Sequence, residues 1–135
     1  MKQPEFRFWT TASEVYLSDR LGLAYDSSMQ DWPYEIADAS RLTEYLDIFS
    51  AEAGNSDVRF TLADVIIQSF EDLDHDLIAD ERWRAFLDDL LKDFEEHAFQ
   101  IWYWSSFEKD MKNGWRVAPY MRALFSASTG KSLEQ

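Results

Sequence analysis

One histidine of the chain follows an aspartate by four residues in a segment with helical periodicity. Asp93 and His97 would share one helix face, where the carboxylate could orient the imidazole as a general base. Such a pair needs a nucleophile or a substrate pocket beside it, and the sequence contains neither a cysteine nor a Gly-x-Ser-x-Gly motif. An enzyme built on this pair, with Tyr103 nearby, is therefore the alternative interpretation, and a helix-surface or half-buried ion pair is the simpler one.

The other histidine, His75, lies in an acidic run that partly matches a calcium-binding loop. Three aspartates of the run have the right spacing, but Leu77 occupies the position that requires glycine and Trp83 the position that requires glutamate. A di-metal carboxylate bundle needs two Glu-x-x-His motifs, which the sequence does not contain. Thiolate metal sites are excluded because the chain has no cysteine. The sequence therefore predicts no metal and no cofactor.

The charge of the chain is strongly negative and unevenly distributed. Its 135 residues include 26 acidic and 13 basic ones, which gives a net charge of −13 at pH 7. Residues 64–96 alone contain 12 acids and 3 bases, a net charge of −9. Such a charge repels nucleic-acid phosphates and anionic lipids and attracts basic protein surfaces. We therefore expect no nucleic-acid or membrane partner, but a basic protein partner.

The predicted contact surface is the acidic run from Glu71 to Glu81, with tryptophans as anchors because this residue type is enriched at interface hot spots. A solvated face that only keeps the protein soluble is the simpler explanation of the run. We also expect like-charge crowding to raise the pKa values of several of these acids on folding. The residues predicted to bind the partner are Glu71, Asp72, Asp74, Asp76, Asp80, Glu81, Trp83 and Trp32.

In its size, charge, tryptophan content and lack of cysteine, together with the acidic run, the chain resembles the small acidic helical immunity proteins that bacteria pair with secreted toxins. The resemblance is one of class and assigns no residue. It implies a non-enzymatic immunity or inhibitor protein that covers a basic surface of a partner such as a toxin domain. A regulatory adaptor that binds a partner helix in an apolar groove is a further alternative, and homodimerisation is also open.

The elements that must position these residues are predicted to be helices. We expect an all-α, single compact bundle-like domain of about five helices over residues 1–125, with a flexible tail over 126–135. The rings of Phe6 to Trp9 should form a short extended N-terminal arm, and the apolar segment 99–104 should be the centre of the core. Periodicity and capping residues predict helices over about 12–22, from Pro33 to before Gly54, over about 61–73, over 80–104, and from Pro119.

Two further features bear on location. No apolar run approaches the length of a membrane-spanning helix, and the first residues lack the apolar region of a signal peptide. The absence of cysteine fits a reducing compartment. We therefore expect a cytoplasmic protein.

Overall fold

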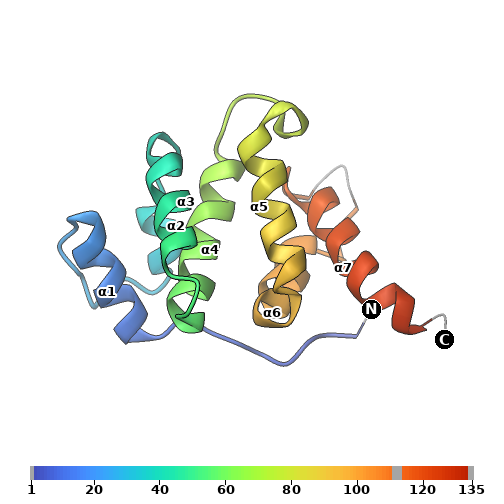
Figure 1. The fold of residues 1–135 in the computed structure, drawn as a ribbon, viewed down its shortest axis with the longest axis horizontal. Helices are drawn as coiled ribbons and strands as arrows, with labels where there is room; N and C mark the ends of the chain where they lie inside the picture. The colour runs from blue at the N-terminus through green and yellow to red at the C-terminus, as the bar shows by residue number, and fades with distance from the viewer. Residues whose placement is uncertain (1, 111–113, 134–135) are drawn as a thin grey trace. The chain divides into compact units, whose positions relative to one another are not determined.

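The computed structural model describes residues 2–110 and 114–133, and every regular element in these ranges is helical (Figure 1). The predicted all-α class is confirmed, with seven α-helices in the described ranges where about five were expected. None of these helices is both long and apolar enough to cross a membrane. The elements are α1 (Thr11–Leu21), α2 (Trp32–Ile36), η1 (Ala39–Arg41), α3 (Leu42–Ala51), α4 (Ser56–Glu71), η2 (Leu77–Ala79), α5 (Glu81–Lys92), α6 (Phe94–Ser105) and α7 (Ala118–Leu133).

The helices belong to two units, which are described separately. The α1–α4 unit comprises Phe8–Leu73, and the α5–α7 unit combines Met1–Arg7 with Asp74–Gln135. The single domain over residues 1–125 stays a prediction. α7 continues to Leu133, beyond the helix end predicted near residue 125, whereas residues 134–135 of the predicted tail lie outside the described ranges.

In the α1–α4 unit, the core is built around α4, against which α1, α2 and α3 all pack. Twelve of the 16 residues of α4 are buried, including polar ones. The hydroxyl groups of Thr61 and Ser69 donate hydrogen bonds of 2.9 and 2.8 Å to backbone carbonyls one turn earlier. Asp64, which is 3% exposed, accepts a hydrogen bond of 2.7 Å from Trp9 Nε1. These partners allow polar residues to occupy a helix that is buried nearly all round.

The starts of α1 and α4 are set by local capping, and both are shifted from the sequence prediction. α1 is capped by Thr10, which accepts a hydrogen bond from the Ser13 amide, one residue before the predicted cap. Gly22 ends α1 as predicted, in the left-handed conformation at φ 70°. α4 begins five residues earlier than predicted because Asn55 accepts a hydrogen bond from the amide of Val58.

Two predicted helices are interrupted at aspartates. The helix expected from Pro33 divides into α2, η1 and α3, because Asp38 is extended (φ −139°, ψ 108°) and caps the amide of Ser40 at 3.0 Å. The helix expected over 80–104 begins after Asp80 as predicted but breaks at Asp93, where φ is −110° and ψ 43°. Aspartate favours caps and turns over helix interiors, since its side chain competes for backbone amides.

In the α5–α7 unit, α6 packs along α7, and α5 contacts both helices. Segment 99–104, predicted to be the centre of the core, is buried only in part, and Gln100 and Ile101 are among its buried residues. Trp104 is buried, but Phe99 and Trp102 are only partly buried and Tyr103 is 41% exposed. The large apolar side chains of this unit that are buried include Trp83, Phe86, Leu90, Ile101 and Phe125, and those only partly buried include Phe94, Trp102 and Leu124.

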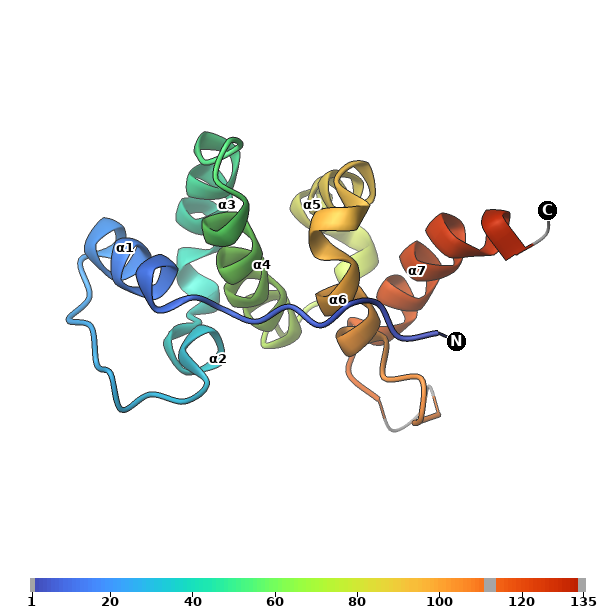
Figure 2. The same ribbon diagram turned by 90° about the horizontal axis from the view of Figure 1, so that it is seen from below.

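The N-terminal arm is extended, as predicted, and its path is visible in Figure 2. In the α5–α7 unit, the Phe6 ring lies edge-on to Phe99, with centroids 5.0 Å apart, and Arg7 Nη1 donates to the Glu96 carbonyl at 2.9 Å. In the α1–α4 unit, the Trp9 ring packs edge-on against Tyr34 at 5.3 Å. The arm is therefore held by hydrogen bonds from Arg7 and the Trp9 indole and by contacts between aromatic rings, and not by deep burial.

Candidate protein-binding surface

The predicted acidic run is divided by the fold. Glu71 and Asp72 end α4 and belong to the α1–α4 unit, whereas the acids from Asp74 onward belong to the α5–α7 unit. Glu71 is half-buried, Asp80 is buried, and the other four predicted acids are exposed. The acids of the run thus belong to two units, and each group is described within its own unit.

Asp80 is a structural residue of the α5–α7 unit. Its carboxylate caps α5 through the Arg82 amide at 2.9 Å and pairs with the Arg82 guanidinium through both oxygens, at 3.2 and 2.9 Å. His75 Nε2 also lies 2.9 Å from Asp80 Oδ2. The hydrogen bonds from Arg82, supported by His75, hold the pKa of Asp80 well below its usual range, although burial acts in the opposite direction. The expected rise in pKa is therefore wrong for Asp80.

Two more arginines hold the loop between Asp74 and Asp80. Arg84 Nη1 donates to the Ile78 carbonyl at 2.8 Å, and Arg116 Nη2 donates to the carbonyl of His75. Arg116 is 41 residues from His75 in sequence, so a count of charges along the chain does not place it here. With Arg82, three guanidinium groups offset the acids of this loop.

The two tryptophans predicted as anchors are core residues. Trp32 is 1% exposed in the first turn of α2, and Trp83 is 0% exposed on the inner face of α5. The Trp83 ring packs edge-on against Tyr120 at 5.5 Å. Neither indole offers surface to a partner in this fold, because burying a large ring is worth more than exposing it.

The negative charge is concentrated in the α1–α4 unit. Residues 8–73 contain 13 acids and three arginines, a net charge of −10, whereas the rest of the chain contains 13 acids and 10 bases, a net charge of −3. From the sequence alone, the excess of acids is instead assigned to residues 64–96, which belong partly to each unit. Nine of the 13 acids are exposed, namely Asp19, Asp26, Asp31, Glu35, Asp38, Glu44, Asp47, Asp57 and Asp72.

Each arginine of the α1–α4 unit has a partner within that unit. Arg20 pairs with Glu52 at 2.6 Å, and Arg41 pairs with Glu44 at 2.8 Å. Arg59 is 7% exposed, and its guanidinium carbon lies 4.0 Å from the centroid of a phenylalanine ring in α3. The positive charges of the unit are thus bound internally, while most of its carboxylates face solvent.

The alternative acid–base pair lies at the start of α6. Asp93 precedes the first turn, and His97 is 0% exposed. His97 Nδ1 is hydrogen-bonded with Gln100 Oε1, and His97 Nε2 lies 3.0 Å from Glu96 Oε2. The neighbours of the imidazole therefore include a carboxylate and an amide from its own helix. The pair stays a prediction as a catalytic unit.

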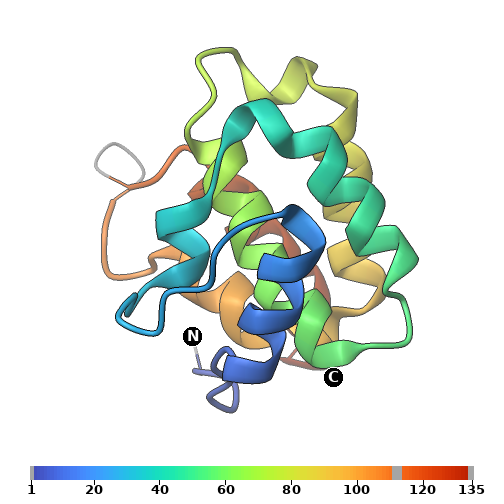
Figure 3. The ribbon, with the colours of Figure 1, turned by 90° about the vertical axis from the view of Figure 1, so that its left-hand side faces the viewer.

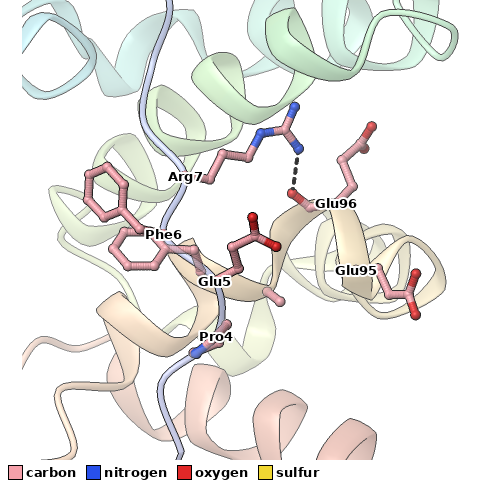
Figure 4. Close-up of a pocket in the computed structure, with 8 residues that line it drawn as sticks. Pro4, Glu5, Phe6, Arg7, Glu95 and Glu96 are labelled. Carbon is pink, nitrogen blue, oxygen red and sulfur yellow. Dashed lines mark hydrogen bonds between the residues drawn. The ribbon is translucent and has the colours of Figure 1, made fainter.

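A cavity of about 240 Å³ lies between the N-terminal arm and the first turns of α6 (Figure 4). The Phe6 ring and the Glu5 carboxylate extend from the arm, and Arg7 donates to the carbonyl of Glu96. The remaining lining residues are Pro4, Glu95, Ala98 and Phe99, so His97 does not face this cavity. A catalytic role of His97 would need access to substrate by another route.

We expect acid to destabilise the protein in part through Asp80. Its folded pKa lies below its unfolded value, so it contributes stability above the unfolded pKa, and this contribution is lost as the pH falls. The free energy of unfolding should decrease from about pH 5 to about pH 3, and decrease less in Asp80→Asn. Urea unfolding at both pH values measures this difference, and equal decreases in the two proteins would contradict the role of Asp80.

Within the described ranges, no group of three or more His, Asp or Glu side chains is arranged to hold a metal ion. The most distinctive charge feature is the acidic, base-poor α1–α4 unit. Comparisons of the chain with protein-family models, curated proteins and solved structures find no match.

Proposed function

We propose that this protein is a non-enzymatic, acidic protein-binding protein of the inhibitor or immunity type, which covers a basic surface of a partner such as a toxin domain. The observation that carries the proposal is the net charge of −10 in the α1–α4 unit, whose three arginines are all engaged. An excess of carboxylates over basic groups creates a field that speeds encounter with a basic surface and disfavours acidic partners.

We infer that the partner contacts the α1–α4 unit rather than the acidic loop between Asp74 and Asp80. In the loop, Arg82, Arg84 and Arg116 offset the carboxylates, whereas residues 21–40 contain four acids and no base. Of the acids predicted from the sequence, Glu71 and Asp72 stay part of the proposed surface because they belong to this unit. Asp74, Asp76 and Glu81 belong to the other unit and are not part of the proposed surface.

Binding should depend on the acids of one unit more than on those of the other. The probe is a lysine-rich amphipathic peptide, and its counterpart has every lysine replaced by glutamine. The triple variant Asp19→Asn, Asp31→Asn, Asp47→Asn should weaken binding of the lysine peptide by about tenfold at low salt. The matched control is Asp74→Asn, Asp88→Asn, Glu108→Gln in the α5–α7 unit, which removes the same charge from exposed side chains.

Titration followed by amide chemical shifts measures both affinity and location. We expect shifts mainly in residues 8–73, a steep loss of affinity with added salt, and little binding of the glutamine peptide. The proposal is overturned if the lysine peptide does not bind, or if both triple variants weaken binding equally.

A further inference from the structure

The outer face of α1 exposes apolar side chains in the unit that has the larger net negative charge. Val15 is 45% exposed and Tyr16 is 38% exposed, and the exposed Ala12 lies one turn earlier on the same face. The opposite face buries Leu17 and Leu21, consistent with the packing of α1 on α4. Figure 3 shows α1, in blue, from its outer side. We define the α1 face as Ala12, Val15, Tyr16 and Asp19.

Tyr16 is held in place although it is exposed. Its hydroxyl group donates to the Glu52 carboxylate at the end of α3, and Arg20 Nη1 donates to the same hydroxyl at 3.0 Å and to Glu52 Oε2 at 2.6 Å. This three-residue link ties α1 to α3. A side chain already fixed before binding loses little conformational entropy in a complex, and tyrosine is enriched among residues that dominate interface energy. Tyr16 thus has the properties of a preorganised anchor.

We infer that the α1 face docks an amphipathic basic helix of the partner protein, an inference that rests on the proposed function. An apolar centre surrounded by charged groups is the usual anatomy of a specific interface. The narrow apolar stripe suits packing against another helix. Lysine and arginine side chains of that helix meet the exposed carboxylates of the unit, while its apolar side chains pack on Val15 and Tyr16. A second copy of this chain carries the same charge of −13 and would be repelled.

The experiment separates apolar docking from charge attraction. It uses a lysine-rich peptide with leucines along one helix face, and a second peptide of equal charge with serines in place of the leucines. The full-length wild-type protein should bind the leucine peptide about tenfold more tightly than the serine peptide. Val15→Ser combined with Tyr16→Ala should remove this preference and leave the salt dependence unchanged. The matched control is Leu91→Ser on α5, where the leucine is 41% exposed.

Tyr16→Phe provides a second, milder variant that keeps the ring and removes the hydroxyl link. It should reduce the leucine preference without abolishing it, since the ring stays but is less ordered. If neither peptide binds the wild-type protein, the proposed function itself fails. If both peptides bind with equal affinity, or if Leu91→Ser removes the preference as fully as the α1 variant, the α1 face is overturned while the proposed function stands.

Discussion

Replacement of Arg122 by methionine is expected to destabilise the α5–α7 unit by about 3 kcal/mol, because hydrogen bonds from a charged donor are each worth about 1.5–3 kcal/mol and do not add fully. Arg122 reaches from α7 to the end of α6. Its Nε donates to the Ser105 carbonyl at 2.7 Å, and its Nη2 donates to the carbonyls of Ser106 and Lys109 at 2.7 and 2.5 Å. Ser106 ends α6 in the left-handed conformation, with φ 51°. One guanidinium thus binds the Ser105 carbonyl in the last turn of α6, where carbonyls lack partners within the helix, and two carbonyls of the segment that follows.

Urea unfolding followed by circular dichroism measures this change. Arg84→Met is the matched control, because Arg84 also donates to a backbone carbonyl but makes a single exposed bond, to Ile78. We expect Arg84→Met to lower the free energy of unfolding by less than about 1 kcal/mol. The loss of unfolding free energy in Arg122→Lys should lie between those of the two methionine variants, since an ammonium group cannot reproduce the planar, multidentate hydrogen bonding of a guanidinium. Equal costs for Arg122→Met and Arg84→Met would show that the α6 carbonyls are satisfied without Arg122.

Trp9→Phe is expected to destabilise the α1–α4 unit by about 2–3 kcal/mol, as for removal of one donor from a buried charge. The indole Nε1 donates to Asp64 Oδ2 at 2.7 Å, and Asp64 is 3% exposed in the middle of α4. Phenylalanine keeps an aromatic ring for the edge-on contact with Tyr34 but has no donor. The loss of stability arises because the buried Asp64 carboxylate loses a hydrogen-bond donor that replaces water.

A double-mutant cycle isolates this hydrogen bond. Trp9→Phe, Asp64→Leu and the combined variant are unfolded in urea, and the coupling energy should be about 1.5–3 kcal/mol. Phe8→Leu, at an exposed neighbouring ring, should change stability by less than about 0.5 kcal/mol. A coupling energy near zero would mean that Asp64 is held by its other contacts.

Elements with a strong local signal were predictable from the sequence. Gly22 ends α1 and Asp80 caps α5 because each acts on backbone groups within a few residues. α4 was harder, since Asn55 appeared to belong to a loop and polar residues such as Asp64 and Ser69 interrupt the apolar pattern. Asp64 accepts a hydrogen bond from Trp9, which is 55 residues away, and Ser69 donates to the carbonyl of Val65, one turn earlier. Only the folded chain reveals that these polar positions are internal.

The distribution of charge over the folded protein was likewise not predictable from the sequence alone. The window with the greatest excess of acids, residues 64–96, crosses the boundary between the two units. It also omits Arg116, which the fold brings to His75. Exposure was equally hard to predict, because Trp83 and Tyr16 are both aromatic residues on amphipathic helices, yet one is buried and the other lies on the surface. Helical periodicity identifies a face, but the packing partner decides which face is covered.

The N-terminal arm also has a consequence for how the chain acquires its structure during synthesis. Phe6 and Arg7, which precede the α1–α4 unit in the chain, find their partners in Phe99 and Glu96, and the Arg7–Glu96 hydrogen bond spans 89 positions. Because domains generally fold as they are completed, the α1–α4 unit can fold before the residues that bind Phe6 and Arg7 have been synthesised. Phe6 and Arg7 are therefore made before the α1–α4 unit but can reach their partners only after Glu96 and Phe99 have been made. A fragment that starts at Asp74 would lack a segment of its own unit.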